Sequence, residues 1–458
     1  MNRIALLAAL LGTAAPLAAE THLVEPGEGA GARLQEALIL AAPGDTIELG
    51  AGLFVMTDGL SLDVDGVTVR GAGMDKTVLE FTNQQGAGEG LLVTSDNVTL
   101  RDFAIENAKG DGIKSKGADN IVYSGIRVAW TGGPKATNGA YGIYPVESTG
   151  VLVIESMVYG ASDAGIYVGQ SRDITVRDNI VGFNVAGIEI ENSRNALVTN
   201  NIATRNTGGI LVFDLPSLPV MNGGNVILRK NVLTDNDTPN FAPPGNIVAS
   251  VRRGTGVLVM ANDGVLIEGN SFDNNPTAHV MVIAYLQPFE DPRYNPYARN
   301  VIVGSNTFGR GGDDPQLDGK EALLAAFGGA LPPVLWDGIE EQPGNGLKIA
   351  PGVTGWSLNL TKAGQSLAEA QPGPLTLAPT ESWDFPEVGG CSASPTMRKG
   401  STPCRRRRAM ARGAARCRSA WRRCGKFRGA EAPARWCAAI ARWQNRKARA
   451  WPRHRPRR

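Results

Sequence analysis

A short apolar phrase recurs at a fixed spacing and limits what this chain can fold into more than any other feature. Gly-Ile-Tyr-Val begins at Gly165, Gly-Ile-Glu-Ile at Gly187 and Gly-Ile-Leu-Val at Gly209, so each copy follows the last after 22 residues. Two further short segments rich in β-branched residues follow each copy, separated by Gly and Asn. Three short strands per repeat predict one coil of a parallel β-helix, which buries its apolar side by stacking on the next coil.

The same phase extends beyond these three copies. Equivalent segments begin at Gly90, Gly112, Gly142, Gly256 and His279. We therefore predict an all-β fold, a single-stranded right-handed parallel β-helix with coils of about 22 residues. The alternative, a leucine-rich or helical solenoid, is disfavoured because the repeat lacks an LxxLxL pattern and is rich in β-branched residues.

Helical spacing near the start of the chain predicts a cap on this β-helix. Leu34 and Leu38 lie on one side of a short helix that leads into the first strands, and a cap of this kind keeps an open strand edge from pairing with other chains. Asn179, Asn201 and Asn231 open the third strand of successive coils. Because asparagine tolerates left-handed backbone and its amides can bond along a stack, we expect these residues to form ladders at the turns.

The N-terminal segment differs from the rest of the chain. Residues 1–19 combine one Arg, an apolar stretch and small residues before Glu20, a layout typical of a cleavable secretory signal. The alternative is an apolar helix of the folded domain. We expect an exported protein, periplasmic or extracellular, with no membrane span, because no later stretch approaches ~20 uninterrupted apolar residues.

The C-terminal segment is strongly basic. Residues 403–458 hold 20 of the 46 Lys and Arg residues and one acid, Glu431, and all five cysteines lie between 391 and 437. This mixture of Arg, Ala, Trp and Cys without a period is typical of a GC-rich gene read in a shifted frame, or of a disordered segment. An arm that binds polyanions is the alternative. We expect no nucleic-acid partner, and we divide the remainder into a β-helix over 20–312 and an irregular segment with a short helix over 313–390.

Four insertions into the 22-residue unit lie at one ladder of strands, the ladder that the repeated glycines open. They are residues 131–138, 215–224, 238–254 and 287–299. Insertions of this kind commonly mark the binding face of a solenoid. We therefore expect functional residues among the outward side chains of this ladder.

The outward side chains divide into a polar, aromatic half and an apolar half. Sugar rings stack on aromatic side chains, and sugar hydroxyls bond to carboxylates and amines. We therefore expect the polar half to bind a polysaccharide, through Lys114, Lys116, Tyr144, Tyr167 and Glu191. The alternative is that these side chains only solvate a strand face.

A pair of carboxylates within reach of the same face is the candidate for acid and base chemistry. We predict Glu189 and Asp163 as catalytic residues, with Glu147 and Asp214 as weaker candidates. If the protein is an enzyme, the expected class is a polysaccharide lyase, hydrolase or epimerase.

The apolar half requires a cover, because a row of exposed aliphatic side chains is unusual on a monomer. Either the Pro-rich loops or a second exported protein covers it. For the second case, a non-enzymatic scaffold, we expect the partner to dock on Leu211, Phe213, Leu258 and Met260.

We expect no cofactor and no metal site. No Cys or His cluster occurs within the repeats, and the calcium-binding nonapeptide pattern is absent from the sequence. His279, the only histidine within the coils, has no acidic neighbours in the sequence and is predicted to be a structural turn residue.

Two resemblances support these interpretations. The segment from about Arg33 to Gly309 resembles right-handed pectin-lyase-like β-helices, although the basic residue and acidic calcium ligands of its lyases, and the His-containing acidic motif of its epimerases, are not visible here. The passages 159–171, 186–193, 208–219 and 240–250 are similar to a group of exported bacterial parallel β-helix repeat proteins of uncharacterised function. That group implies a second exported protein as partner and supplies no catalytic residues, and the basic tail departs from its pattern.

Overall fold

The structure, a computed structural model, describes residues 19–86, 88–362, 365 and 367–388. All of the described residues belong to one compact unit. The predicted signal segment, except Ala19, and the basic tail lie outside the described residues. Within the described part, no helix combines the length and apolar character needed to cross a membrane.

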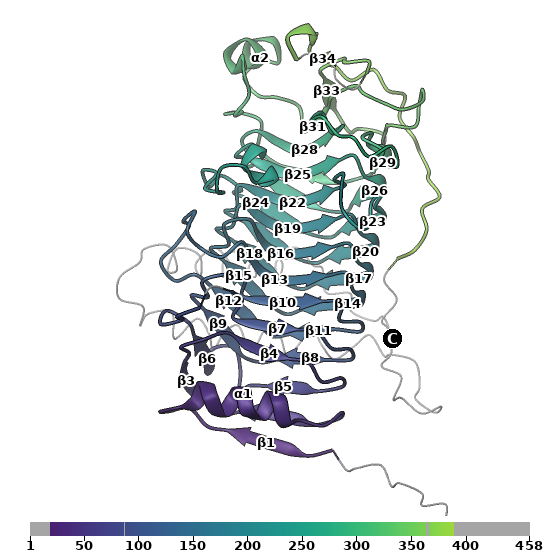
Figure 1. The fold of residues 1–458 in the computed structure, drawn as a ribbon. Helices are drawn as coiled ribbons and strands as arrows, with labels where there is room; N and C mark the ends of the chain where they lie inside the picture. The colour runs from purple at the N-terminus through teal and green to yellow at the C-terminus, as the bar shows by residue number, and fades with distance from the viewer. Residues whose placement is uncertain (1–18, 87, 363–364, 366, 389–458) are drawn as a thin grey trace, which may run out of the picture. The chain divides into compact units, whose positions relative to one another are not determined.

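Three parallel sheets run along this unit, and successive coils contribute one strand to each (Figure 1). Sheet A has 12 strands: β1 Thr21–Val24, β2 Thr46–Leu49, β5 Thr68–Arg70, β8 Thr99–Arg101, β11 Val122–Ser124, β14 Thr149–Ile154, β17 Arg172–Arg177, β20 Arg194–Thr199, β23 Gly224–Arg229, β26 Asp263–Glu268, β29 Arg299–Val303 and β32 Leu347–Ile349. Sheet B has 10 strands: β3 Gly52–Val55, β6 Thr77–Glu80, β9 Ala104–Glu106, β12 Arg127–Ala129, β15 Met157–Tyr159, β18 Ile180–Gly182, β21 Ile202–Thr204, β24 Val232–Thr234, β27 Ser271–Asp273 and β30 Thr307–Phe308.

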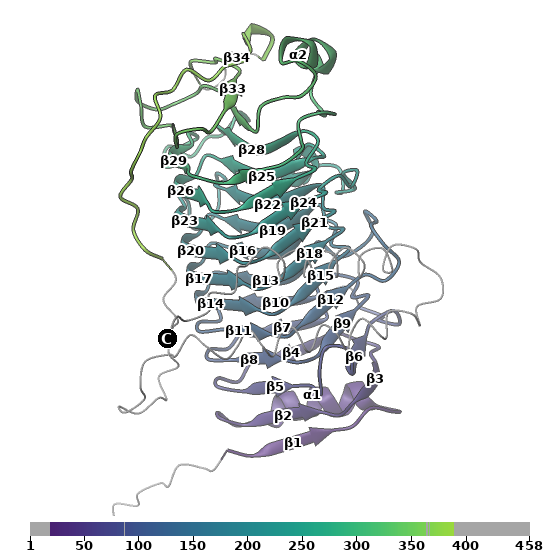
Figure 2. The same cartoon turned by 180° about the vertical axis from the view of Figure 1, so that it is seen from behind.

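Sheet C contains the glycine-opened strands of the repeat and carries the candidate site. Its 12 strands are β4 Leu60–Leu62, β7 Leu91–Val93, β10 Ile113–Lys116, β13 Tyr141–Val146, β16 Ala164–Gly169, β19 Ala186–Glu191, β22 Gly208–Phe213, β25 Thr255–Met260, β28 Ala278–Ile283, β31 Val334–Trp336, β33 Gly355–Ser357 and β34 Gly373–Pro374. Only the β33–β34 pair in this sheet is antiparallel. The predicted parallel β-helix is confirmed, and its strands follow one another in coil order from either side (Figure 2).

The register of sheet C explains why the repeated phrase is apolar at alternate positions. Ile166 pairs with Ile188 and Ile188 with Ile210, and all three side chains are fully buried between the sheets. The residues between them point outward, because side chains alternate along a strand. One 22-residue shift therefore brings each inward side chain over its equivalent in the next coil.

Asparagine ladders stabilise two of the turns. The amide of Asn179 donates to the side-chain oxygen of Asn201 at 3.0 Å, and Asn201 donates in the same way to Asn231. This ladder was predicted. A second one, Asn184 to Asn206 to Asn236 to Asn275, was missed because its members precede the glycine strand rather than open one.

The two ends of the β-helix are built differently. Helix α1, Ala30–Leu40, buries Leu34 and Leu38 against the first coils, as predicted for a cap. At the other end we expected the coils to stop at residue 312, yet β31, β32 and β33 continue sheets A and C beyond it. The short helix predicted in this segment is α2, Lys320–Ala326. The 3-10 helices are η1, Ile247–Ser250, and η2, Leu367–Glu369.

Candidate functional site

The outward positions of sheet C form one continuous column across the coils. Lys114 pairs with Leu92 on one side and Tyr144 on the other. Further along, Glu189 lies between Tyr167 and Leu211. The β-helix therefore places the predicted binding, catalytic and docking residues on one face.

Near β10 and β13 the column is partly open to solvent and its lysines are paired within the chain. Lys114 Nζ lies 3.2 Å from a carboxylate oxygen of Glu89 and 5.0 Å from the centre of the Tyr144 ring. Lys116 Nζ lies 3.8 Å from a carboxylate oxygen of Glu147. Both cations thus have an acidic neighbour before any ligand arrives, and Glu147 is an ion-pair partner.

Three tyrosines form the next part of the face. The ring centres of Tyr141 and Tyr144 are 4.5 Å apart, and the ring of Tyr167 lies 4.5 Å from the first and 4.9 Å from the second. Tyr141 was not predicted, because alternation along the strand gives it the inward parity of Ile143, yet its ring packs with Tyr144 and Tyr167. The cluster presents aromatic surface where sequence analysis placed only two rings.

The orientation of Tyr167 depends on a glycine in the same strand. A Cβ atom at Gly169 would lie 2.3 Å from the Tyr167 ring, so only glycine permits the ring to lie flat across this position. The Tyr167 hydroxyl then donates to Glu191 Oε1 at 2.6 Å. The repeat thereby joins an aromatic side chain of one coil to a carboxylate of the next.

Asp163, Glu189 and Glu191 form a buried acidic cluster beside these tyrosines. Their exposed fractions are 4%, 1% and 6%. Both carboxylate oxygens of Glu189 and one of Asp163 have no hydrogen-bond partner among the described residues. Unpaired buried polar atoms are costly and uncommon in native proteins, which makes the cluster a candidate site.

Burial raises the pKa of each acid in the cluster, and the charge of another acid adds to the effect. Loss of hydration and the charge of Glu191 raise the pKa of Asp163 to about 7. Loss of hydration raises the pKa of Glu191 to about 7 against the opposing hydrogen bond from Tyr167. The pKa of Glu189 is raised well above its usual value, first by burial and then by the charges of Asp163 and Glu191. Groups with such pKa values can hold or release a proton near neutral pH.

The insertion 238–254 covers this cluster. The amide of Asn246 donates to Asp163 Oδ2 at 3.3 Å, and Val248 and Val251 pack in one apolar cluster with Tyr167 and neighbouring side chains. Asn240 holds the loop's own shape by donating to the carbonyls of Val248 and Val251. Glu189 is therefore enclosed by a loop, and not exposed on the strand face as its alternating position suggests.

The apolar half of the column is also covered by the chain itself. The residues predicted to bind a partner are Leu211, Phe213, Leu258 and Met260, with exposed fractions of 0%, 1%, 6% and 8%. They pack with residues of the loops 215–224, 238–254 and 287–299. The expectation that these four side chains offer an open docking row is therefore wrong, and the first of the two covers considered, the loops, is observed.

Two further acids near the column have different environments. Asp214 accepts the backbone N–H groups of Asn222 and Gly223, which fixes the start of a loop, and loss of hydration raises its pKa to about 6. Asp111 was missed by sequence analysis; it accepts the N–H of Tyr141 at 3.1 Å, and burial raises its pKa to about 6. Its position directly before Gly112 was the available signal.

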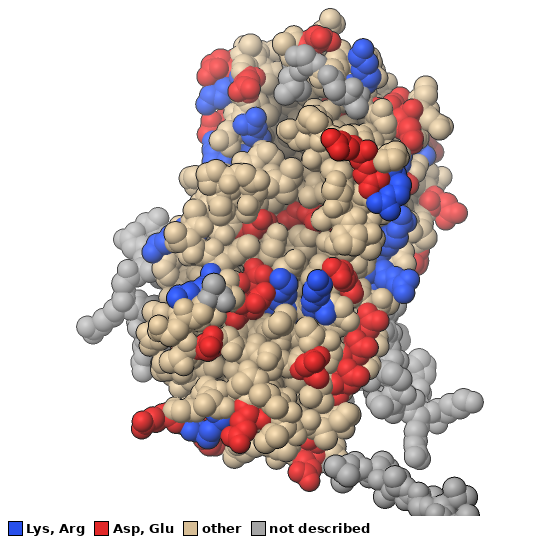
Figure 3. Space-filling view, in the orientation of Figure 1, with Lys and Arg blue, Asp and Glu red and all other residues tan. Residues whose placement is uncertain are grey.

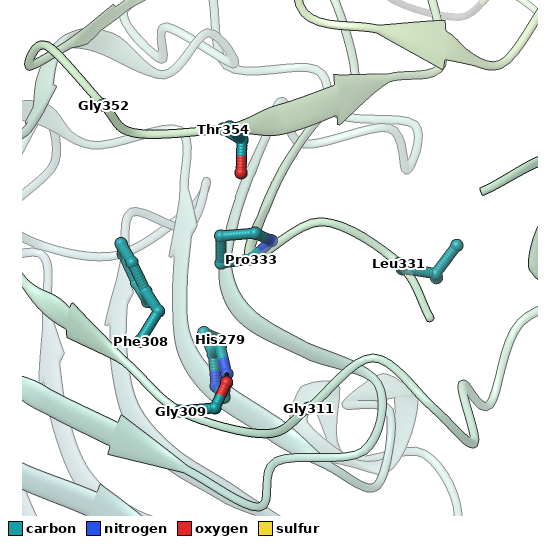
Figure 4. A pocket seen from close by; sticks show the side chains of 8 residues that line it. All are labelled: His279, Phe308, Gly309, Gly311, Leu331, Pro333, Gly352 and Thr354. Atoms are coloured by element: carbon teal, nitrogen blue, oxygen red, sulfur yellow. Dashed lines mark hydrogen bonds between the residues drawn. The ribbon is translucent and has the colours of Figure 1, made fainter. Parts of the chain in front are cut away.

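His279 lies in strand β28, whereas a turn was predicted, and its contacts are structural. Its Nδ1 accepts from the amide of Asn275 at 3.1 Å and its Nε2 donates to the carbonyl of Gly309 at 3.2 Å. Burial lowers the pKa of His279. The ring stacks on Phe308 beside a pocket of about 380 Å³ that Leu331, Pro333 and Thr354 also line (Figure 4).

Within the described residues, no group of three or more His, Cys, Asp or Glu side chains is arranged to hold a metal ion.

Comparisons with known proteins agree with the observed architecture. Residues 65–217 match the family model described as a right-handed beta helix region. No curated protein matches the sequence. The family match covers about a third of the chain, and together with the stacked coils it supports the right-handed parallel β-helix fold.

Several solved structures are similar to this chain. A mannuronan C-5 epimerase A-module from Azotobacter vinelandii has 14% sequence identity and a TM-score of 0.46, covering 72% of this chain and 94% of its own. A DFA-IIIase from Arthrobacter chlorophenolicus A6 has 14% identity and a TM-score of 0.47, covering 72% and 95%. An alginate lyase from Paenibacillus sp. str. FPU-7 has 18% identity and a TM-score of 0.38, covering 65% and 96%.

Proposed function

We propose that this protein is exported, binds a polysaccharide along the outer face of sheet C and acts on it with Asp163 and Glu189. The observation that carries the proposal is the buried acidic cluster, whose unpaired carboxylate oxygens lie beside three tyrosines. Strongly perturbed acids beside an aromatic surface are typical of sites that combine sugar binding with proton transfer.

The acid pair supplies the two protonation states that such chemistry needs. Asp163 raises the pKa of Glu189, so ionisation of one carboxyl opposes ionisation of the other. A pair that holds one proton between its members provides a general acid and a general base at the same time. In this proposal Glu189, the more deeply buried of the two, keeps the proton, and Asp163 is the base.

The remaining predicted residues have binding roles in the proposal. Tyr144, which is half-buried, offers ring surface for sugar stacking. Tyr167 and Glu191 are only 4% and 6% exposed, so in this proposal the Tyr167 ring and the Glu191 oxygen that it does not use contact a sugar once the loop 238–254 has moved. Lys114 and Lys116 mark the open end of the face, where they are already paired with Glu89 and Glu147. A polymer entering there would reach the tyrosines before the acids.

Catalysis in this proposal requires the loop 238–254 to move, because Glu189 is enclosed. Val251 offers a way to test the movement, since a Cβ atom at Gly208 would lie 3.1 Å from its Cγ1. The double variant Gly208→Cys, Val251→Cys should form a disulfide that locks the loop. Carbodiimide labelling of Glu189, followed by mass spectrometry, should fall at least tenfold under oxidising conditions and recover with reductant. Each single-cysteine variant is the control, and equal labelling with and without the lock would exclude loop opening.

Activity is tested on the full chain with a panel of neutral and acidic polysaccharides. Reducing ends and unsaturated products are measured separately, since hydrolysis gives only the first. Replacing Glu189 with Gln or Asp163 with Asn should lower the rate at least 100-fold. Glu155→Gln, an exposed residue at another corner of the coil, is the matched control. Absence of binding and turnover across the panel, or full activity in both acid variants, would reject the proposal.

A further inference from the structure

The charges along the outer face of sheet C are unevenly paired. Both lysines of this face, Lys114 and Lys116, already have a carboxylate partner, Glu89 and Glu147 respectively. In Figure 3 basic and acidic atoms lie side by side at about the level of β10 and β13. The described part of this face therefore offers no lysine without an acidic neighbour to an incoming anion.

The acids deeper in the site have no such compensation. The charges with the largest effect on the pKa values of Asp163, Glu189 and Glu191 are those of other acids. Further acidic atoms are visible in the recess at about the level of β19 (Figure 3). Lys114 lowers the pKa of Asp111, and the same lysine also pairs with Glu89.

From this charge layout we infer that the sugar units bound at the acidic cluster carry no carboxylate. The inference rests on the proposed function and specifies its substrate class. A uronate unit placed on the tyrosines would bring a negative charge next to three acids in a site that excludes water, where like charges repel more strongly than in solution. A neutral sugar meets no such cost, since its hydroxyls donate to ionised carboxylates and accept from protonated ones.

The substrate class also limits the reaction. Elimination and C5 epimerisation of uronates both begin by removing a proton next to a carboxylate, and a neutral sugar has no such acidified C–H bond. Hydrolysis remains, with water as co-reactant. One acid of the pair gives its proton to the glycosidic oxygen as the bond to the anomeric carbon breaks. The other takes a proton from the water whose oxygen bonds to that carbon, so the pair ends with one proton as it began.

The alternative that the experiment must exclude is that Lys114 binds the carboxylate of a uronate unit. Side chains of Lys114 and Glu89 are 26% and 27% exposed, and ion pairs of this exposure are weak enough to exchange partners. If a uronate displaced Glu89 from Lys114, the face would select acidic polymers. A pair of polymers that differ only in charge distinguishes the two cases.

The experiment compares binding of polyuronates with binding of their neutral esters to the full chain. Polygalacturonate and alginate are paired with their fully esterified forms, and neutral glucans and mannans complete the panel. Calorimetry at pH 7 and low salt should show neutral polymers binding at least tenfold more tightly than uronates. In the double variant Asp163→Asn, Glu191→Gln this ratio should fall toward one, because the repulsion is removed. Glu155→Gln should leave it unchanged.

Each outcome decides a different question. Uronates that bind as tightly as their esters, with binding lost in Lys114→Met, would overturn this inference while the proposed function stands. A ratio that persists in the double variant would also overturn it, because the discrimination would then not come from the acids. Binding of no polymer of either kind would instead reject the proposed function. Should the double variant fold poorly, Asp111→Asn tests the same repulsion at a less buried acid.

Discussion

Two stretches of sheet C share one backbone geometry and differ in what covers them. Around β7, β10 and β13 the outward side chains are partly open, and Leu92, Lys114 and Tyr144 are only half-buried. Around β22 and β25 the equivalent column is closed, and Leu211 is fully buried beneath loops of the same chain. The comparison shows that alternation along a strand decides which side chains point outward from the core. The loops then decide which of these side chains are exposed to solvent.

The acidic cluster lies where these two stretches meet. Tyr167 faces the open tyrosines on one side, and Glu189 pairs in register with the buried Leu211 on the other. A carboxylate at this boundary is dehydrated by the loop yet remains next to surface that a ligand can reach. The candidate site therefore depends on both stretches, because it needs the covering loop of one and the open tyrosines of the other.

The largest predicted effect contrasts two leucines in one column. Leu211→Asp places a charge beneath the loops and should lower the free energy of unfolding by about 3–5 kcal/mol. Leu92→Asp, at the equivalent position of the open stretch, should cost less than about 1 kcal/mol. Urea unfolding followed by tryptophan fluorescence measures both variants. Similar losses at the two positions would contradict the distinction between covered and open stretches.

A pH dependence of intermediate size should arise from the boundary acids. The pKa of Asp163 rises from 3.8 to about 7, and that of Glu191 from 4.5 to about 7. Between these limits the folded chain binds more protons than the unfolded chain, so stability falls as pH rises from about 4 to about 7. Each such group contributes a slope of up to about 1.4 kcal/mol per pH unit.

Variants identify the source of this slope. Unfolding midpoints between pH 4 and pH 8 should vary less in Asp163→Asn and in Glu191→Gln than in the unmodified chain. Glu155→Gln should keep the original slope. Stability that stays constant or rises with pH across this window would contradict the raised pKa values of these acids.

The smallest predicted effect concerns the open stretch. Lys114→Met removes the ion pair with Glu89 and the cation above Tyr144, and should lower the free energy of unfolding by no more than about 1 kcal/mol. The effect should shrink at high salt, because partly exposed pairs are screened. Lys116→Met, whose pair is longer and more exposed, should change stability less. A loss of several kcal/mol at Lys114 would mean that this stretch is as closed as the one around Leu211.

Much of the fold followed from the repeat, but features outside its period were missed. The coils, the capping helix and the ladder of Asn179 and Asn201 were predictable because a local sequence pattern indicates each of them. Strands β31 to β33 were not, since long loops separate them from the last regular coil and remove the 22-residue spacing. Tyr141 and Asp111 were also missed, although both precede a glycine of the same series.

The period of the β-helix, the inward and outward positions of its strands and the ladder that carries the insertions can all be predicted from the amino-acid sequence. These depend on alternation and on contacts one coil apart, and both leave a regular trace along the chain. The enclosure of Glu189 and the covering of the apolar row, in contrast, are seen only in the folded chain. That outcome depends on contacts such as the hydrogen bond from Asn246 to Asp163. Asn246 follows Asp163 by 83 residues and lies in a loop without periodicity. A covering loop changes hydration and pKa values without changing any pattern in the strands beneath it.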